Sequence, residues 1–404
     1  MSEGKQYIPD QFAGREFKAA SVTQAKVSTK LYKTSSSDPA ATDDTGLGYA
    51  AGTIWTNTTS GQVFICTVDT AEDATWVGQE GDTINEPFTI GASNVWYSGG
   101  MRDGAGRPGG GDYSAEEVNS FPVTSSGNAT DIGETDTTTH TSGPTSAIHD
   151  DSFVYLAGGN AANHPTSNAA GAYTSEINRS AMASPVSFTD IGDLDAGTTA
   201  EAAGGTDGVS GWVAGGRQPS SITQIDKFSL ASPSTTSDTG GDLTAANNRL
   251  GGHSDCLNSK IFVSGGYAPS RVDTIESFPM TITTGTSSDY GELSVAKAKQ
   301  GSIASTTHAF TIGGDAPGAT NLMEKFPFTA PTSNTDIGEL ISAKYEVRGM
   351  GSPDSTAAGF CMGGKTAAAD TIDEIDKFSL SSPGNASDWG NLIEKPASGY
   401  ASGV

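Results

Sequence analysis

The sequence predicts an all-β protein whose main part is a six-bladed β-propeller, preceded by an extended arm and a small β-hairpin module. Three observations predict this fold. A short apolar segment ending in two glycines occurs six times, the spacing between successive glycine pairs is 48 to 59 residues, and only 35% of the 404 residues are hydrophobic while glycine is abundant. A unit of this length cannot bury its own apolar face, so several units must stack, as propeller blades do.

The glycine pairs define the repeat. The six segments are NVWYSGG, FVYLAGG, GWVAGG, KIFVSGG, AFTIGG and GFCMGG, and their second glycines are Gly100, Gly159, Gly216, Gly266, Gly314 and Gly364. A glycine doublet permits positive φ angles and a close approach of strands near a narrow axis. We therefore interpret these glycines as structural.

Each unit contains three further signatures. An aromatic anchor follows the glycine pair in five units, at Phe121, Phe228, Phe278, Phe326 and Phe378, whereas the second unit has Ser180 there. Next comes an aspartate two residues before a glycine, as in TDIGEL, and then a loosely apolar Gly/Ser segment. Four segments of strand length bounded by turns predict a four-stranded antiparallel blade.

The two ends of the repeat region complement each other. The last unit ends in SGYASGV, which matches the opening strand of a blade and has no glycine-pair strand after it. The first glycine-pair strand, in turn, lacks a clear opening strand before it. We therefore expect residues 398 to 404 to pair with the first blade and close the ring, which would remove the exposed edges of a linear array.

Three regions are expected. Residues 1–45 form an extended basic attachment arm and linker, 46–90 a small β module, and 91–404 the propeller closed by its C-terminal strand. In the module, the segments TIWTN and QVFICTV alternate around a TSG turn, and Trp76 returns toward them. This arrangement is typical of a hairpin.

Charge limits the choice of partners. The formal net charge is −25, but residues 1 to 33 contain six basic and three acidic residues. An acidic body repels nucleic acid and anionic membranes, so neither is an expected partner. The basic arm could instead bind an acidic protein surface.

Few residues suggest chemistry. The three cysteines, Cys66, Cys256 and Cys361, are scattered, which argues against a disulfide framework and a zinc site. The N-terminus is polar, and no apolar run approaches the length that crosses a bilayer, so we expect neither a signal peptide nor membrane insertion. The sequence contains no HExxH motif, no GxSxG motif and no Walker loop. We expect no catalytic residues, no metal and no cofactor.

The repeated aspartates are best interpreted as structural. They are Asp131, Asp190, Asp289, Asp336 and Asp388. The segment SSDYG also matches the start of the Asp box of sialidases. A residue that recurs in five blades is rarely catalytic, and aspartate readily accepts hydrogen bonds from backbone amides in turns. We expect these carboxylates to bond the backbone before the outer strand.

The differences between units point to a binding face. The loop after the glycine pair spans 18 positions in the first two units and 9 to 11 in the others. It shares a face with the connections between blades, and eleven of the sixteen basic residues after residue 90 lie there, although acidic residues also occur there. This face could bind an anionic surface glycan or an acidic protein. The predicted binding residues are Arg102, Arg107, Tyr113, Tyr173, Arg217, Arg271 and Lys365.

The order of an apolar strand ending in Gly-Gly, an anchor aromatic and a closing strand resembles the kelch repeat over residues 94 to 404. The anchors are phenylalanines, whereas kelch blades have Tyr and then Trp. The phrases NATDIGE, FTDIGDL and TDIGEL resemble divergent kelch-type repeats of marine and cyanobacterial bacteriophage structural proteins, and GTIWTNTTSGQVFIC is similar to a module of phage tail-fibre proteins.

The resemblance implies a virion protein. Its N-terminal part would attach to other virion proteins, and its propeller would present a binding face, for a host receptor or surface glycan, in a homo-oligomeric appendage. A purely structural collar, tail or capsid-decoration protein is the alternative. A glycan-active enzyme is disfavoured because no acid, nucleophile or metal set can be named.

Overall fold

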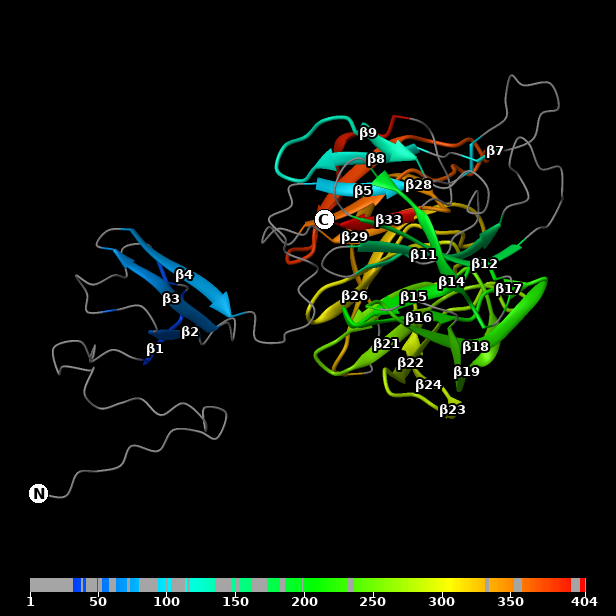
Figure 1. Cartoon of the computed structure of the whole chain (residues 1–404). Helices are drawn as coiled ribbons and strands as arrows, with labels where there is room; N and C mark the ends of the chain where they lie inside the picture. Colours follow the sequence, from blue (N-terminus) through cyan, green and yellow to red (C-terminus); the bar gives the residue numbers. More distant parts are fainter. Residues whose placement is uncertain are drawn as a thin grey trace, which may run out of the picture. The chain divides into compact units, whose positions relative to one another are not determined.

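The computed structural model separates the chain into two compact units, Met1–Thr83 and Ile84–Val404 (Figure 1). Its described residues are 32–37, 39–40, 49, 53–57, 63–70, 73–79, 94–98, 101–102, 113–114, 117–134, 147–149, 153–160, 173–181, 186–195, 197, 199–231, 236–330, 334–351, 358–393 and 400–403. All regular elements among these residues are strands.

The first unit contains one four-stranded sheet. Its strands, in spatial order, are β1 (Tyr32–Ser35), β2 (Ile54–Asn57), β3 (Val63–Thr70) and β4 (Asp73–Gln79). The predicted hairpin is β2 and β3, which pair antiparallel with Trp55 opposite Phe64. Strand β1, from the region expected to be an extended arm, pairs parallel with β2. Trp55 is buried, and its indole Nε1 donates to the Ser37 carbonyl at 2.9 Å, which ties the arm to the hairpin.

Among its described residues, the second unit has six larger sheets, each built on four antiparallel strands. The first three are β33 (Tyr400–Gly403), β5 (Asn94–Ser98), β8 (Glu117–Pro122) and β9 (Thr130–Glu134); β10 (Ala147–His149), β11 (Phe153–Asn160), β12 (Tyr173–Ala181) and β14 (Thr189–Asp193); and β15 (Ala203–Thr206), β16 (Ser210–Ala214), β18 (Ser220–Ser229) and β19 (Ser237–Asn247).

The other three sheets follow the same order. They are β20 (Gly251–Asp255), β21 (Lys260–Ser264), β22 (Thr274–Pro279) and β24 (Ser288–Glu292); β25 (Gly301–Ala304), β26 (His308–Ile312), β27 (Thr320–Pro327) and β28 (Thr335–Lys344); and β29 (Arg348–Gly351), β30 (Ala358–Met362), β31 (Glu374–Ser379) and β32 (Ser387–Asn391). Short additional strands are β6 (Met101–Arg102), β7 (Tyr113–Ser114), β13 (Val186–Ser187), β17 (Arg217–Gln218) and β23 (Gly285–Thr286).

The sheets are arranged as a β-propeller. Their innermost strands contact one another in a closed cycle, in the order β33, β10, β15, β20, β25, β29 and back to β33. The predicted closure is present, since β33 pairs antiparallel with β5 and places Tyr400 opposite Ser98 (Figure 1). The first sheet therefore combines the two ends of the second unit.

The ring is also closed at its outer side. The segment before the outermost strand of one sheet bonds to the outermost strand of the preceding sheet: Gly384 N donates to Ile337 O at 2.7 Å, and Gly127 N donates to Trp389 O at 2.9 Å. Strands β13 and β23 pair with β9 and β19 in the same way. These contacts cover edges that would otherwise expose unpaired backbone groups.

The anchor phenylalanines lie in the core. All five are at most 4% exposed. Apolar clusters join neighbouring sheets, as where Phe121 of the first sheet meets Phe360 of the sixth with 5.4 Å between ring centroids. Trp389 of the sixth sheet donates from Nε1 to the Pro122 carbonyl at 2.8 Å. Burial of these aromatic side chains is the main attraction between sheets.

The glycine pairs have the predicted conformation wherever they are described. In Gly215–Gly216 the φ angles are 64° and 102°. A Cβ atom on Gly215 would lie 2.7 Å from the Asn247 carbonyl oxygen, and Gly216 N donates to that same oxygen at 2.8 Å. Only glycine fits this approach without strain, so the doublet fixes the path from the second strand toward the axis.

Candidate binding site

Three predicted binding residues have described side chains, and all lie on the face that carries the glycine pairs. They are Arg217, Arg271 and Lys365. The others are less completely described. Arg102 and Tyr113 are paired in the β6–β7 hairpin and Tyr173 begins β12, but their side chains, and all of Arg107, lie outside the described residues.

A ring of charged residues precedes the innermost strands. Each member stands two residues before an innermost strand and has a φ angle of 57° to 60°. The four members, which we call the inner ring, are Glu201, Arg249, Lys299 and Glu346. Their backbones form a hydrogen-bonded series in which each amide donates to the preceding member's carbonyl, at 2.7, 3.0 and 2.9 Å. This series places four charged side chains around the propeller axis.

A second ring surrounds the first. It consists of the residues directly after the glycine pairs, and the members with described side chains are Arg217, Tyr267, Asp315 and Lys365. Each forms a β-bridge with the residue that precedes an inner-ring member, for example Arg217 with Ala200 and Lys365 with Tyr345. The position after the glycine pair therefore brings predicted binding residues to the axis.

Ion pairs link the two rings. Glu201 Oε2 lies 3.1 Å from Arg249 Nε and 3.9 Å from Arg217 Nε. Glu346 is also shared, since its Oε1 contacts Lys299 Nζ and its Oε2 lies 3.6 Å from Lys365 Nζ. Each glutamate is thus placed between two cations.

Further contacts hold the cations of this face in place, including Arg271. Nη2 of Arg271 lies 2.7 Å from both carboxylate oxygens of Asp315. The Arg249 guanidinium lies 5.5 Å from the Tyr267 ring centroid, and the Lys299 ammonium lies 5.3 Å from that of Tyr345. Cation–π contacts of this kind fix a long side chain against a rigid surface.

Two lysines counted among the basic residues of this face prove to be buried. Lys297 and Lys344 are both 0% exposed. Lys297 Nζ lies 3.2 Å from Glu324 Oε1, and Lys344 Nζ lies 2.8 Å from Asp376 Oδ2. Burial lowers the pKa of Lys297 although Glu324 opposes the shift. These two lysines connect neighbouring sheets and are not available to a ligand.

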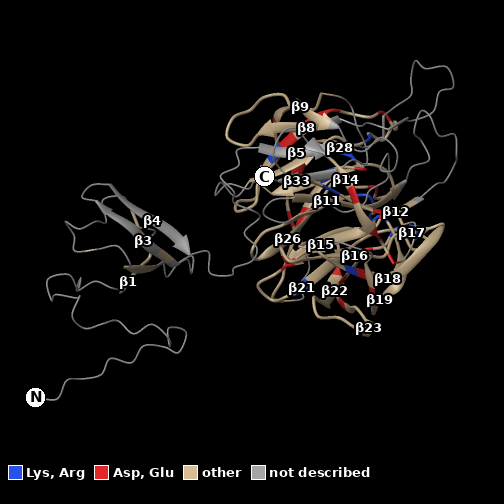
Figure 2. Cartoon of the chain, in the orientation of Figure 1, with Lys and Arg blue, Asp and Glu red and all other residues tan. Residues whose placement is uncertain are grey.

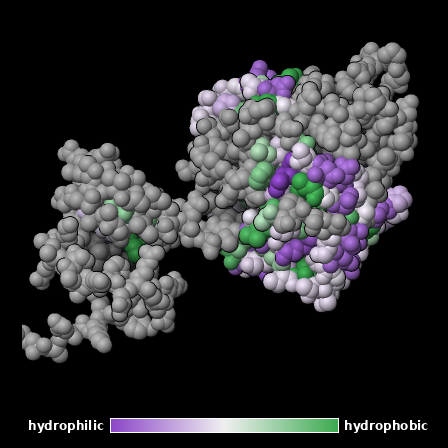
Figure 3. Space-filling view, viewed as in Figure 1, coloured by the Kyte–Doolittle hydropathy of each residue, from purple (hydrophilic) through white to green (hydrophobic). Residues whose placement is uncertain are grey.

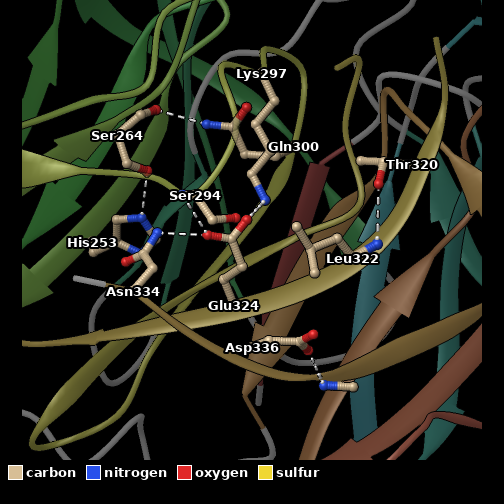
Figure 4. A network of polar contacts seen from close by, with 11 residues as sticks. His253, Ser264, Ser294, Lys297, Gln300, Thr320, Leu322, Glu324, Asn334 and Asp336 are labelled. Carbon is tan, nitrogen blue, oxygen red and sulfur yellow. Dashed lines mark hydrogen bonds and ion pairs between the residues drawn. The ribbon is translucent and has the colours of Figure 1, made fainter. Parts of the chain in front are cut away.

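The Lys297 contact belongs to a buried polar network (Figure 4). Glu324 also accepts from Ser294 N at 3.1 Å and Asn334 Nδ2 at 2.6 Å. Burial alone would raise the pKa of Glu324, but Lys297 and these two donors lower it below 4.5. The carboxylate is therefore ionised and fully used in structure.

A serine–histidine contact occurs in the same network. His253 Nε2 lies 3.0 Å from Ser264 Oγ (Figure 4), and its Nδ1 lies 3.0 Å from the Ile303 carbonyl, to which it donates. Burial lowers the pKa of His253 from 6.5 to about 4, and Lys297 adds to this effect. The pair resembles a nucleophile and its base. However, the two side chains are 1% and 0% exposed, so no substrate reaches them and the histidine is a core residue.

The repeated aspartates bind backbone amides. Asp131, Asp190 and Asp336 each accept from the glycine two residues later, at 2.8 to 3.0 Å. They lie within the outermost strand, next to a register shift, and not in a turn before it. The structural interpretation is confirmed for these three residues, with their position corrected.

A second set of repeated polar residues, which are buried, was not predicted from the sequence. These residues lie two positions before each anchor and are at most 7% exposed; they are Asn119, Asn178, Asp226, Glu276, Glu324 and Asp376. Several bond to the preceding sheet, as where Glu276 accepts from Thr244 N at 3.1 Å and Asn119 accepts from Ile393 N at 2.9 Å. The sequence pattern that reveals these residues is an acid or an amide two positions before each anchor.

The described surface offers few apolar contacts. The large exposed hydrophobic residues among the described ones are Ile54, Val209, Leu257, Ile341 and Ile393. The described atoms in Figure 3 are largely hydrophilic, with scattered apolar areas. Within the described part of the chain, no three metal-binding side chains lie together, and no helix has the length and apolarity needed to cross a membrane.

Comparison with known proteins finds similarity in structure but not in sequence families or curated proteins. No family model matches this chain, and no curated protein is similar to it. Many solved structures match, and one of them, described as the structure of YjhT, is 13% identical with a TM-score of 0.49. The match covers 64% of this chain and 86% of that one. The likeness is too distant to bear on function.

Proposed function

We propose that this chain is a bacteriophage virion appendage protein, a tail fibre or a protein of the tail or neck. Its first 90 residues attach to the particle, and its propeller, six-bladed and of the kelch kind, presents the face around the two charged rings to a binding partner. Support for the kelch kind comes from the glycine pairs, and support for six blades comes from the closed cycle of six innermost strands.

One observation carries the assignment of a binding role to this face. Core positions recur from sheet to sheet, whereas the inner ring holds Glu, Arg, Lys and Glu at equivalent places. Packing selects similar residues at equivalent positions, so this variation indicates a surface shaped for a particular partner. Figure 2 shows that acidic and basic residues both occur on the propeller.

The proposal concerns binding and not catalysis. The serine–histidine pair is buried, Glu324 is saturated with donors, and the repeated aspartates bind backbone. None of these groups therefore combines a reactive geometry with access.

Purified particles test the proposal. Mass spectrometry of the particles is expected to detect the chain, and particles that lack it are expected to assemble but not to adsorb to cells. Failure to assemble would favour the alternative, a structural collar, tail or decoration protein. Absence of the chain from purified particles would contradict both.

A further inference from the structure

The inner ring uses an unfavourable backbone conformation. Its four residues lie in the left-handed region, which is costly for residues with a Cβ atom and costs nothing extra for glycine. The chain contains 52 glycines, and those of the described glycine pairs lie in this region. The charged side chains are therefore retained where glycine would fit more easily. Local strain of this kind is a feature of functional sites.

Ion pairing alone does not explain the charges around Glu201. The side chains of Arg217, Arg249 and Glu201 are 33%, 24% and 14% exposed. Pairs of this exposure contribute little to stability. The pairs of Glu346 are more buried, since its side chain is 7% exposed and those of Lys299 and Lys365 are 17% and 11% exposed.

The rings contain more cations than acids. The ring members Arg217, Arg249, Lys299 and Lys365, together with Arg271, which pairs with Asp315 from beside the rings, face Glu201, Asp315 and Glu346. This gives a local excess of two positive charges on a chain whose net charge is −25. An anionic group is therefore attracted to the axis in preference to the rest of the propeller.

We propose that the two rings bind an acidic polysaccharide, a sugar chain that carries carboxylate groups; this assignment rests on the binding role proposed above. Guanidinium groups such as those of Arg217 and Arg249 bind carboxylates with good geometry. Glu201, whose side chain is 14% exposed, accepts hydrogen bonds from sugar hydroxyls, whereas Glu346 is buried and paired with two lysines. A polyanion without hydroxyls, such as an acidic peptide, is repelled by these glutamates. The mixture of donors and acceptors therefore favours the acidic sugar.

Fluorescence anisotropy of the full chain with labelled probes tests the site. The probes are an oligomer of mannuronate and guluronate, a neutral dextran oligomer of equal length, and polyglutamate with the same number of carboxylates. The oligouronate is expected to bind, dextran to show no binding, and polyglutamate to bind at least tenfold more weakly.

Two double variants locate the binding. Arg217→Gln with Arg249→Gln is expected to weaken oligouronate binding at least tenfold. The matched control, Arg179→Gln with Lys227→Gln, removes two cations that lie over Phe153 and Trp212 outside the rings, and it is expected to leave binding unchanged. Melting curves verify that both variants fold.

Three outcomes would overturn the proposal: no binding of the oligouronate, equally tight binding of polyglutamate, or equal loss in the control variant. Equally tight polyglutamate binding would indicate an acidic protein partner. Absence of the chain from virions would instead contradict the function proposed above and leave this site intact.

Discussion

Single buried polar residues determine how neighbouring sheets fit together. Glu324 receives hydrogen bonds from a lysine, an amide and a backbone group, and His253 is enclosed between Ser264 and the Ile303 carbonyl. Each such group would be costly to bury without these partners. The residues therefore specify which sheets are neighbours as well as stabilising the contact.

His253 gives the fold a pH dependence. Its pKa is about 4 in the folded protein, against 6.5 for the ordinary side chain, so between these values the unfolded chain binds a proton that the folded chain excludes. The contribution of His253 to the free energy of unfolding is complete above pH 6.5 and is lost as the pH falls toward 4. This residue accounts for about 3 kcal/mol over that interval.

Urea unfolding of the wild type and of His253→Gln at several pH values measures this dependence. The wild type is expected to lose about 3 kcal/mol more than the variant between pH 6.5 and 4, since carboxylates contribute equally to both proteins. Parallel curves would show that His253 does not titrate as described.

At the scale of elements, the outermost strand of each sheet receives the next sheet's loop. The glycine of the Asp-x-Gly signature makes this contact, since a Cβ atom on Gly338 would lie 2.3 Å from the Gly384 carbonyl oxygen. The φ angle of Gly338 is 134°. The aspartate before it binds the glycine amide and holds the strand in shape.

Replacing Gly338 with alanine should destabilise the ring, whereas Gly384→Ala should not. An added Cβ at Gly338 meets backbone, but one at Gly384 has nothing within 4 Å. We expect a loss of about 2 to 3 kcal/mol for Gly338→Ala and less than about 0.5 kcal/mol for Gly384→Ala, measured by chemical unfolding. Equal effects would mean that the close approach is absent.

At the scale of the whole molecule, strand β33 follows the sixth sheet in the sequence and pairs with β5 of the first sheet. A chain that ends at Ser398 leaves β5 with an unpaired edge. Its propeller transition in calorimetry should fall by about 10 °C or more. Removal of residues 1–31, which belong to the other unit, serves as the control and should leave that transition unchanged. A truncated chain that melts like the intact one would contradict the closure.

The propeller and its closure could be predicted because each sheet packs in the same way, so the residues that pack recur in the sequence at a regular spacing. The positions of Arg217 and Lys365 beside the innermost strands could be predicted for the same reason, since both directly follow glycine pairs, whereas their binding role stays a prediction. Lys297 and Lys299 could not be told apart, because sequence shows that both lie in one connection and not which way each points. Lys297 points inward and forms an ion pair with Glu324 of the next sheet, which the sequence does not reveal.

The central claim is that the inner ring keeps its charges for binding and not for folding. It is tested most directly by the thermal melting of a variant with glycine at all four positions, Glu201, Arg249, Lys299 and Glu346. Relief of backbone strain offsets the lost ion pairs and the added freedom of the unfolded chain, so the account predicts a melting temperature within about 3 °C of the wild type. A fall of about 10 °C or more would show that the ring is a structural brace and would contradict the claim.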